Sequence, residues 1–295
     1  MASFTPRSRQ RISRRSLLKT GVIGAAGLAL YSGEIERHWI DVRQIDITLR
    51  GLPAAFEGLR IAQLSDIHME EYTESFFLHR VVGYINQLQP DMILLTGDFV
   101  SEWPGSKQLA QRAAWYCAEI LKELKCEERY AVLGNHDVAV GEKEVTAALT
   151  ASRIPVLNNS YLPLDRGGSR IWLAGLDDPV NGHPEPELAI PASIRNLPEQ
   201  PLLLMCHAPD YADELLTQPL SKAVDLMLSG HTHGGQVRLP WIGPLTLPIQ
   251  GKKYVEGHFR FGDMQLYVNR GIGTVGVPLR FDCPPEITLF TLRRA

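Results

Sequence analysis

Short apolar runs alternate with helical patterns along the chain from about residue 40 onward. Ile45, Ile47 and Leu49 alternate with polar residues, which predicts a half-buried strand in 43–52. Apolar runs predict buried strands in 59–68, 91–98, 129–137, 201–210 and 223–235, and helical spacing predicts helices in 76–88 and 105–126. No internal repeat is visible in the sequence. Strands that alternate with helices are typical of an α/β layered domain.

Each of the five buried strands ends in a polar cluster. The clusters are Asp66 and His68 in SDIH, Asp98 in GDF, Asn135, His136 and Asp137 in GNHD, His207 in CHAPD, and His231 and His233 in GHTH. Ligand sites in open α/β sheets lie beyond the carboxyl ends of the strands. We therefore expect the five clusters to converge on one edge.

Carboxylate, amide and imidazole side chains together suit Mn, Fe or Zn. A single D-x-H pair is weak evidence, because such pairs are common in solvated loops. A glycine precedes Asp98, Asn135 and His231, and glycine lets the backbone approach a ligand closely. Five such clusters in series indicate a metal site.

The charge is distributed unevenly along the chain. Six of its 30 Lys and Arg residues, and none of its 33 acidic residues, lie in residues 1–33. The remaining body, 34–295, has a net charge of about −9. Its length and composition predict one globular domain. So acidic a body is a poor binder of nucleic acid. The four cysteines form no CxxC pair, and any disulfide pairing stays undecided.

The first 33 residues have the layout of an export signal. A basic cluster precedes an apolar run centred on 22–30, and Ser13–Arg14–Arg15–Ser16–Leu17–Leu18–Lys19 resembles a twin-arginine signal. This resemblance implies export of the folded protein by the twin-arginine machinery to the periplasm or another extracytoplasmic compartment. The run is shorter than the ~20 apolar residues that span a bilayer comfortably. An uncleaved N-terminal anchor that associates with the inner membrane remains the alternative.

The order D-x-H, G-D, G-N-H-D, a lone H and G-H-x-H resembles the calcineurin-like metallophosphoesterase superfamily from about residue 59 to the C-terminus. The stretches GHTHGGQVRLP, NRGIG and CPPEITLFTL resemble its bacterial exported or membrane-associated branch. The resemblance implies a four-layer αββα sandwich with two divalent metals at the carboxyl ends of the strands. It also implies hydrolysis of a phosphate ester, most simply a phosphodiester, by metal-bound hydroxide.

The resemblance assigns each ligand by position. Asp66, His68 and His233 would hold one metal, Asn135, His207 and His231 would hold the other, and Asp98 would bridge the two. His136 would act as general acid on the leaving oxygen. Many relatives carry an aspartate three residues after the bridging one to orient this histidine, but this chain has Ser101 there. Asp137 could orient His136 instead.

The substrate is less well defined by the sequence. Trp241, Ile242, Pro244, Leu245 and Leu247 could form an apolar wall that suits a lipid-linked phosphate ester, or they could pack as an ordinary loop. Arg238 and Arg270 are candidate phosphate-binding residues. One alternative is a UDP-2,3-diacylglucosamine pyrophosphatase of lipid A biosynthesis, although UDP-sugars are made in the cytoplasm. A more remote alternative is a metal-dependent binding module without activity.

Overall fold

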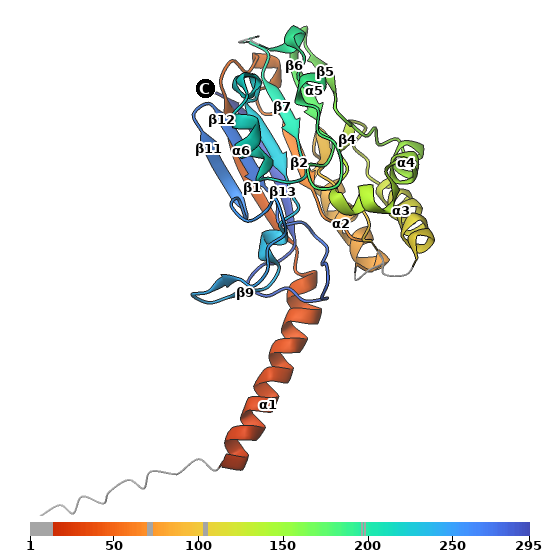
Figure 1. Cartoon of the computed structure of the whole chain (residues 1–295), viewed down its shortest axis with the longest axis vertical. Helices are drawn as coiled ribbons and strands as arrows, with labels where there is room; N and C mark the ends of the chain where they lie inside the picture. Colours follow the sequence, from red (N-terminus) through yellow and green to blue (C-terminus); the bar gives the residue numbers. More distant parts are fainter. Residues whose placement is uncertain (1–13, 70–72, 103–105, 196, 198) are drawn as a thin grey trace, which may run out of the picture.

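The computed structural model describes residues 14–69, 73–102, 106–195, 197 and 199–295. Two β-sheets pack face to face, and helices cover the outer face of each sheet (Figure 1). The predicted four-layer αββα sandwich is therefore confirmed.

The first sheet has five strands. In spatial order they are β1 (Asp41–Leu49), β13 (Glu286–Arg294), β2 (Arg60–Leu64), β3 (Met92–Leu95) and β4 (Arg129–Ala131). Strands β2, β3 and β4 are parallel, so their carboxyl ends lie on the same edge. The edge strand β1 alternates between exposed and more buried positions, as its sequence predicts.

The second sheet has six strands. In spatial order they are β11 (Gly257–Phe261), β12 (Met264–Val268), β8 (Leu226–Ser229), β7 (Leu202–Met205), β6 (Ser169–Gly175) and β5 (Ser160–Arg166). Strands β12, β8, β7 and β6 are parallel. A separate hairpin of β9 (Arg238–Leu239) and β10 (Gly243–Pro244) follows β8.

Three apolar layers hold the sandwich together. One lies between the sheets, where the strand residues Leu94 and Ile61 meet Leu203 and Leu228. The outer face of the first sheet packs against α2 (Ser75–Leu88), α3 (Lys107–Leu121) and α4 (Asn135–Ala151), and that of the second packs against α5 (Pro186–Ala189) and α6 (Tyr211–Leu216). Because both faces are covered, the central strands are apolar at successive positions, with little polar alternation.

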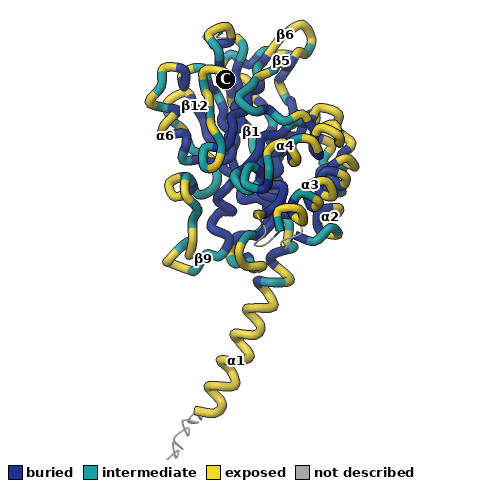
Figure 2. The backbone as a smooth tube through the Cα atoms, turned by 45° about the vertical axis from the view of Figure 1, so that its right-hand side comes forward, coloured by how far each residue is buried: buried dark blue, intermediate teal, exposed yellow. Residues whose placement is uncertain are grey.

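The N-terminal helix α1 (Arg14–Leu30) projects away from the body, and all of its residues are exposed (Figure 2). A π-helical turn at Tyr31–Ile35 and a 3-10 turn at Glu36–His38 join it to β1. Within the described ranges, no helix combines the length and the hydropathy that crossing a membrane requires. Ser13 of the twin-arginine pattern lies outside the described residues.

Candidate metal centre

The structure brings all seven predicted metal ligands together. Asp66 and His68 follow β2, Asp98 follows β3, Asn135 opens α4 directly after β4, His207 follows β7, and His231 and His233 follow β8. The ligands thus come from the carboxyl ends of strands in two sheets. The sequence analysis expected all clusters at the edge of one sheet. The structure instead places them at the edges of two sheets, because three of the four ligand histidines follow strands of the second sheet.

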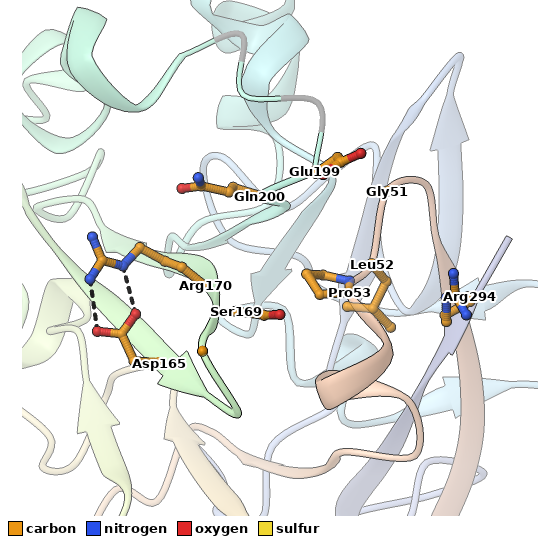
Figure 3. Close-up of a pocket in the computed structure, with 10 residues that line it drawn as sticks. Gly51, Leu52, Pro53, Asp165, Ser169, Arg170, Glu199, Gln200 and Arg294 are labelled. Atoms are coloured by element: carbon orange, nitrogen blue, oxygen red, sulfur yellow. Dashed lines mark hydrogen bonds and ion pairs between the residues drawn. The ribbon is translucent and has the colours of Figure 1, made fainter.

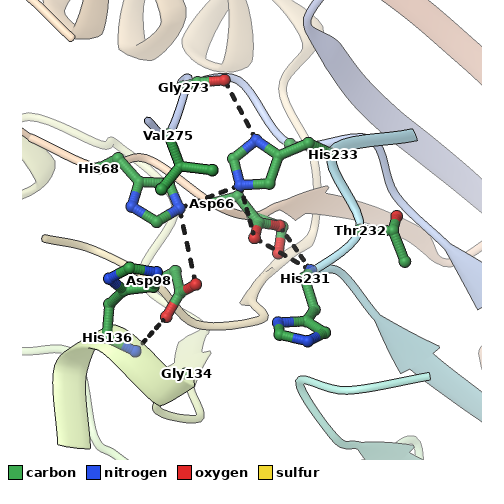
Figure 4. A network of polar contacts seen from close by, with 12 residues as sticks. Asp66, His68, Asp98, Gly134, His136, His231, Thr232, His233, Gly273 and Val275 are labelled. Carbon is green, nitrogen blue, oxygen red and sulfur yellow. Dashed lines mark hydrogen bonds and ion pairs between the residues drawn. The ribbon is translucent and has the colours of Figure 1, made fainter. Parts of the chain in front are cut away.

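Asp66, His68 and His233 form the first cluster (Figure 4). The Nε2 atoms of His68 and His233 lie 3.0 Å apart, and His233 Nε2 lies 3.4 Å from Asp66 Oδ1. All three residues are buried. Two imidazole nitrogens and a carboxylate therefore point at one small volume, which suits a single cation.

Asp98, His207 and His231 form the second cluster, whose ligand atoms lie within 4.8 Å of one another. Oδ2 of Asp98 lies 3.1 Å from His207 Nε2 and 3.5 Å from His68 Nε2 of the first cluster. This one carboxylate therefore lies between the two clusters. Among the described residues, the buried Asn135 Oδ1 and His207 Nε2 make no hydrogen bond. Unsatisfied buried acceptors are costly, and a bound cation would satisfy both.

Hydrogen bonds fix which nitrogen of three histidines is free to bind a cation. His207 Nδ1 donates to the Thr96 carbonyl at 2.6 Å, and His233 Nδ1 donates to the Gly273 carbonyl at 3.3 Å. His231 donates through Nε2 to a backbone carbonyl at 2.7 Å. Each bond leaves the lone pair of the other ring nitrogen directed into the site.

Burial and charge set the protonation of the site. Burial lowers the pKa of His68 to about 3 and that of His231 to about 4, so both imidazoles are neutral at neutral pH. Burial opposes ionisation of Asp98, but the surrounding imidazoles, His207 first among them, together outweigh it and hold the pKa of Asp98 well below its ordinary value. A neutral imidazole and an ionised carboxylate are the forms that bind a metal.

The backbone of the ligand loops is strained. Asp66, His68, Asp98, His231 and His233 all have positive φ, between 49° and 72°. Such a conformation costs of order 1–3 kcal/mol per residue and clusters at functional sites. The glycines next to the ligands are needed for close approach, since a Cβ at Gly134 would lie 2.2 Å from Asp98 Oδ1. A Cβ at Gly230 would lie 2.3 Å from Asp66 Oδ2.

His136 lies next to both clusters, close to Asp98 of the second and His68 of the first. Its backbone N–H donates to Asp98 Oδ1 at 2.9 Å, and its Nδ1 accepts from the backbone N–H of Glu102 at 3.2 Å. Since Nδ1 is an acceptor, the neutral ring carries its proton on Nε2. His136 also lines the pocket beside the metal centre.

Asp137 does not orient His136. Its Oδ1 accepts from the backbone N–H of Phe99 at 2.9 Å and its Oδ2 accepts from that of Gly134 at 3.0 Å. The fully buried carboxylate therefore caps α4 and ties it to the Asp98 loop. Oγ of Ser101 lies 2.8 Å from Nδ1 of His68 and so supports a metal ligand.

The two predicted phosphate-binding arginines are engaged elsewhere. Arg270 is 4% exposed, and its guanidinium donates to Glu286 at 2.7 Å and to Asp41 at 2.6 Å. Arg238 donates to Glu256. Neither arginine lines the pocket at the metal centre, so we assign neither to the substrate.

One wall of that pocket is apolar. Asp98, Asn135, His136, His231 and His233 lie at one side of it. The same pocket is lined by apolar side chains from the segments around β9 and β10 and from the loop before β13: Val237, Leu245, Pro248, Val275, Val277 and Leu279. Of the predicted apolar wall only Leu245 lines the pocket, because Trp241 and Ile242 point outward and are exposed.

A second pocket lies at the amino end of β7 and holds no comparable chemistry (Figure 3). Its lining includes Asp165, Arg170 and Arg294 but no histidine. Arg170 is held by Asp165 through two hydrogen bonds of 2.6 and 2.8 Å. The reactive groups therefore belong to the metal centre.

Comparison with known proteins agrees with this geometry. Residues 59–235 match the family model described as calcineurin-like phosphoesterase. The chain belongs to the calcineurin-like phosphoesterase family. It is 35% identical to YkuE of Bacillus subtilis, an uncharacterized metallophosphoesterase, over 96% of this chain and 99% of that protein. It is 31% identical to the phosphodiesterase YaeI of Escherichia coli, over 95% and 99% of the two chains. It is 26% identical to the UDP-2,3-diacylglucosamine pyrophosphatase LpxG of Chlamydia muridarum, over 92% and 94%.

The chain is therefore a metallophosphoesterase, a hydrolase of phosphoester bonds. The family depends on two metals, and the two clusters around Asp98 fit two cations. Sequence reasoning missed Arg280, which is fully buried. Its guanidinium donates to the carbonyls of Arg270, Gly271, Gly273 and Cys283, and so holds the loop whose Gly273 carbonyl accepts from His233. No motif marks an arginine whose partners are all backbone.

Proposed function

We propose that this protein hydrolyses phosphodiesters at a two-metal centre. The observation that carries the proposal is the position of Asp98, whose Oδ2 faces His207 of one cluster and His68 of the other. Asp66, His68 and His233 would hold one cation, and Asn135, His207 and His231 would hold the second. When bound, two cations lower the pKa of a water and offset charge on the phosphate oxygens.

His136 acts as the general acid in this proposal. The Glu102 N–H that donates to Nδ1 leaves the ring proton on Nε2, and His136 lines the pocket. A leaving alkoxide needs a proton in the transition state, and the imidazolium form of His136 would supply it from Nε2 and become neutral. The main-chain N–H of His136 donates to Asp98 Oδ1, and this bond fixes the position of the acid relative to the bridging ligand.

The apolar wall favours a substrate that carries a hydrocarbon or other apolar group. Leu245, Val275, Val277 and Leu279 line the same pocket as the metal ligands Asp98, Asn135, His231 and His233. This observation also favours a second candidate function, hydrolysis of a UDP-diacylglucosamine-like pyrophosphate, which the relative LpxG is named for. The N-terminal segment supports the first candidate, since a twin-arginine leader would carry the protein out of the cytoplasm.

A metal and substrate screen on the full chain tests the proposal. After treatment with EDTA, the protein is given Mn, Fe or Zn and assayed with bis(p-nitrophenyl) phosphate, p-nitrophenyl phosphate and a UDP-sugar pyrophosphate. We expect fastest turnover of the diester, and none without metal. His79→Ala is the matched control, because His79 is an exposed histidine on α2.

The screen has two other informative outcomes. Preferred cleavage of the pyrophosphate would replace the diesterase proposal with the second candidate. Two bound metals without turnover of any ester would instead favour the non-catalytic binding module.

A further inference from the structure

Three uncharged segments of the chain meet at one end of the molecule. Residues 20–33, 239–251 and 275–279 contain no charged side chain. The first includes most of α1, the second includes the tip of the β9–β10 hairpin, and the third walls the metal pocket. In Figure 1 the hairpin lies at the end of the body from which α1 leaves.

Backbone contacts tie these segments together. The N–H of Arg280 donates to the Ser32 carbonyl at the base of α1 at 3.0 Å. One residue further on, the Phe281 carbonyl accepts from the N–H of Arg238 in β9 at 2.9 Å. The ring of Tyr31 packs edge-on against that of Phe281 at 6.4 Å. The hairpin, the pocket loop and the base of α1 are therefore neighbours in the folded chain.

The hairpin exposes large apolar side chains. Trp241 is fully exposed, Ile242 is 71% exposed and Ile249 is 70% exposed. Trp241 also has a positive φ of 64°, which is unusual for a bulky residue. Single exposed apolar residues are common, but a contiguous uncharged group of them marks an interaction surface. The fold itself gains nothing from holding a tryptophan in a strained conformation in solvent.

We propose that this end of the molecule docks on a phospholipid bilayer, with Trp241 and Ile242 inserted at the interface between headgroups and acyl chains. Tryptophan prefers that interface. The apolar residues of α1 between Val22 and Leu30 are also exposed, and the base of this helix lies at the same end of the body as the hairpin. One flat apolar medium can cover both a projecting helix and a hairpin tip, whereas a protein partner would have to enclose both shapes.

Docking in this orientation has a consequence for the active site. Leu245 and Val277 line the metal pocket and are themselves 56% and 48% exposed, so they form its rim on the docking side. The pocket mouth would then open at the bilayer surface, where a phosphate ester with acyl chains could enter without leaving the membrane. This consequence rests on the proposed function, but the docking does not.

Fluorescence quenching by brominated lipids tests the insertion of Trp241 directly. The full chain is mixed with vesicles of phosphatidylcholine and phosphatidylglycerol whose acyl chains are brominated. We expect wild-type protein to lose a larger fraction of its tryptophan emission than Trp241→Phe, which keeps an aromatic ring at the tip. Trp115→Phe, at an exposed site of α3, is the matched control and should lose at least the wild-type fraction. Equal fractional losses in wild type and Trp241→Phe would overturn the proposal.

Vesicle flotation tests whether the hairpin contributes to binding. Trp241→Glu combined with Ile242→Glu should lower the partition coefficient by about tenfold or more. Trp115→Glu combined with Leu188→Glu, two exposed sites on α3 and α5, should leave it unchanged. Unchanged flotation of the hairpin variant would also overturn the proposal. So would a dimer in sedimentation that the hairpin variant dissociates, because the surface would then belong to a second copy.

Neither docking measurement requires turnover. A soluble nitrophenyl diester should be cleaved equally by wild type and the hairpin variant, since neither Trp241 nor Ile242 lines the pocket. Failure of the wild-type protein to cleave this diester would therefore count against the proposed function alone. Failure of the wild-type protein to bind vesicles would count against docking alone.

Discussion

Nδ1 of His207 donates to the carbonyl oxygen of Thr96 across 2.6 Å, and this bond joins the two sheets at the metal centre. Thr96 follows β3 of the first sheet, whereas His207 follows β7 of the second. The bond fixes the tautomer of His207 and sets the distance between the ligands from the first sheet and those from the second. Nε2 of Gln63, in β2, adds a second link by donating to the Ser229 carbonyl in β8 at 3.0 Å. The site is therefore assembled by the packing of the sheets.

Replacement of the shared carboxylate should affect both metals. Asp98→Asn removes the negative charge between His68 and His207, so we expect metal content and hydrolysis to fall together. Inductively coupled plasma mass spectrometry of the purified protein measures the first, and diester turnover the second. Asp46→Asn, an exposed site on β1, is the control. Two retained metals with a near-normal rate would show that Asp98 is not the bridge.

Removal of the buried guanidinium should weaken the site without touching a ligand. Arg280→Met leaves four backbone carbonyls without their donor, which should lower the free energy of unfolding by about 3 kcal/mol or more. Because the freed loop carries the Gly273 carbonyl that holds His233, we also expect affinity for Mn to fall about 10- to 100-fold. Urea unfolding and metal titration calorimetry measure the two effects.

The matched control for this change is Arg260→Met, at an exposed position of β11. Arg280→Lys keeps the charge and some donors, so its losses should be smaller than those of Arg280→Met. If metal affinity stays at the wild-type value in Arg280→Met, the arginine stabilises the fold alone.

The sequence predicted the ligand set better than it predicted the neighbours of the ligands. Glycine-flanked Asp, Asn and His residues after apolar strands are local signals, and the structure gathers all seven. The partners of Arg270 are not local, because Asp41 and Glu286 reach it from other strands. A candidate phosphate-binding arginine therefore could not be distinguished from a buried ion pair.

Backbone geometry was equally hidden from the sequence. Asp137 follows the predicted acid His136 directly, yet its carboxylate faces the N–H groups of Gly134 and Phe99. Adjacency along the chain gave no hint of that direction, because α4 begins at Asn135 and turns the side chain inward. The strands β5, β6 and β9 to β13 were also not predicted.

Stability should depend on pH through Asp225, next to β8. Burial raises the pKa of this carboxyl from 3.8 to about 6. The hydrogen bond from the Leu202 N–H lowers the pKa but does not cancel the effect of burial. The folded state thus binds a proton more tightly than the unfolded state, and stability is lost as pH rises through this interval. Asp225→Asn cannot ionise and its amide oxygen still accepts from Leu202.

We therefore expect the stability of Asp225→Asn relative to wild type to rise by about 1–3 kcal/mol between about pH 4 and pH 7. Urea unfolding of both proteins across that range measures it. Gln44→Asn, at an exposed position of β1, changes no ionisable group and should show a difference that does not vary with pH. A pH-independent difference for Asp225→Asn would assign this carboxyl an ordinary pKa.

We propose that the two arginines that open α1 direct export of the protein. Arg14 and Arg15 are exposed, so a receptor can reach both guanidinium groups. Replacing both with lysine keeps the charge but removes the planar donor geometry, and should leave the protein in the cytoplasm. Cell fractionation of a bacterial host measures this, with Lys19→Arg as the control. Export of the double lysine variant at the normal level would indicate another route.

A role of His136 as the acid can be distinguished from a role as a metal ligand. If His136 only protonates the leaving oxygen, His136→Ala should keep both metals and bind phosphate normally. It should lose about 10²- to 10⁴-fold in rate on diesters with alkyl leaving groups. Activated nitrophenyl esters should lose much less, because nitrophenolate leaves without a proton. Equal losses on both esters would mean that His136 stabilises charge on the phosphoryl group instead. His68, Asp98 and His136 also lie close enough to share a cation. Loss of a metal in the variant would therefore make His136 a ligand and contradict its role as the acid.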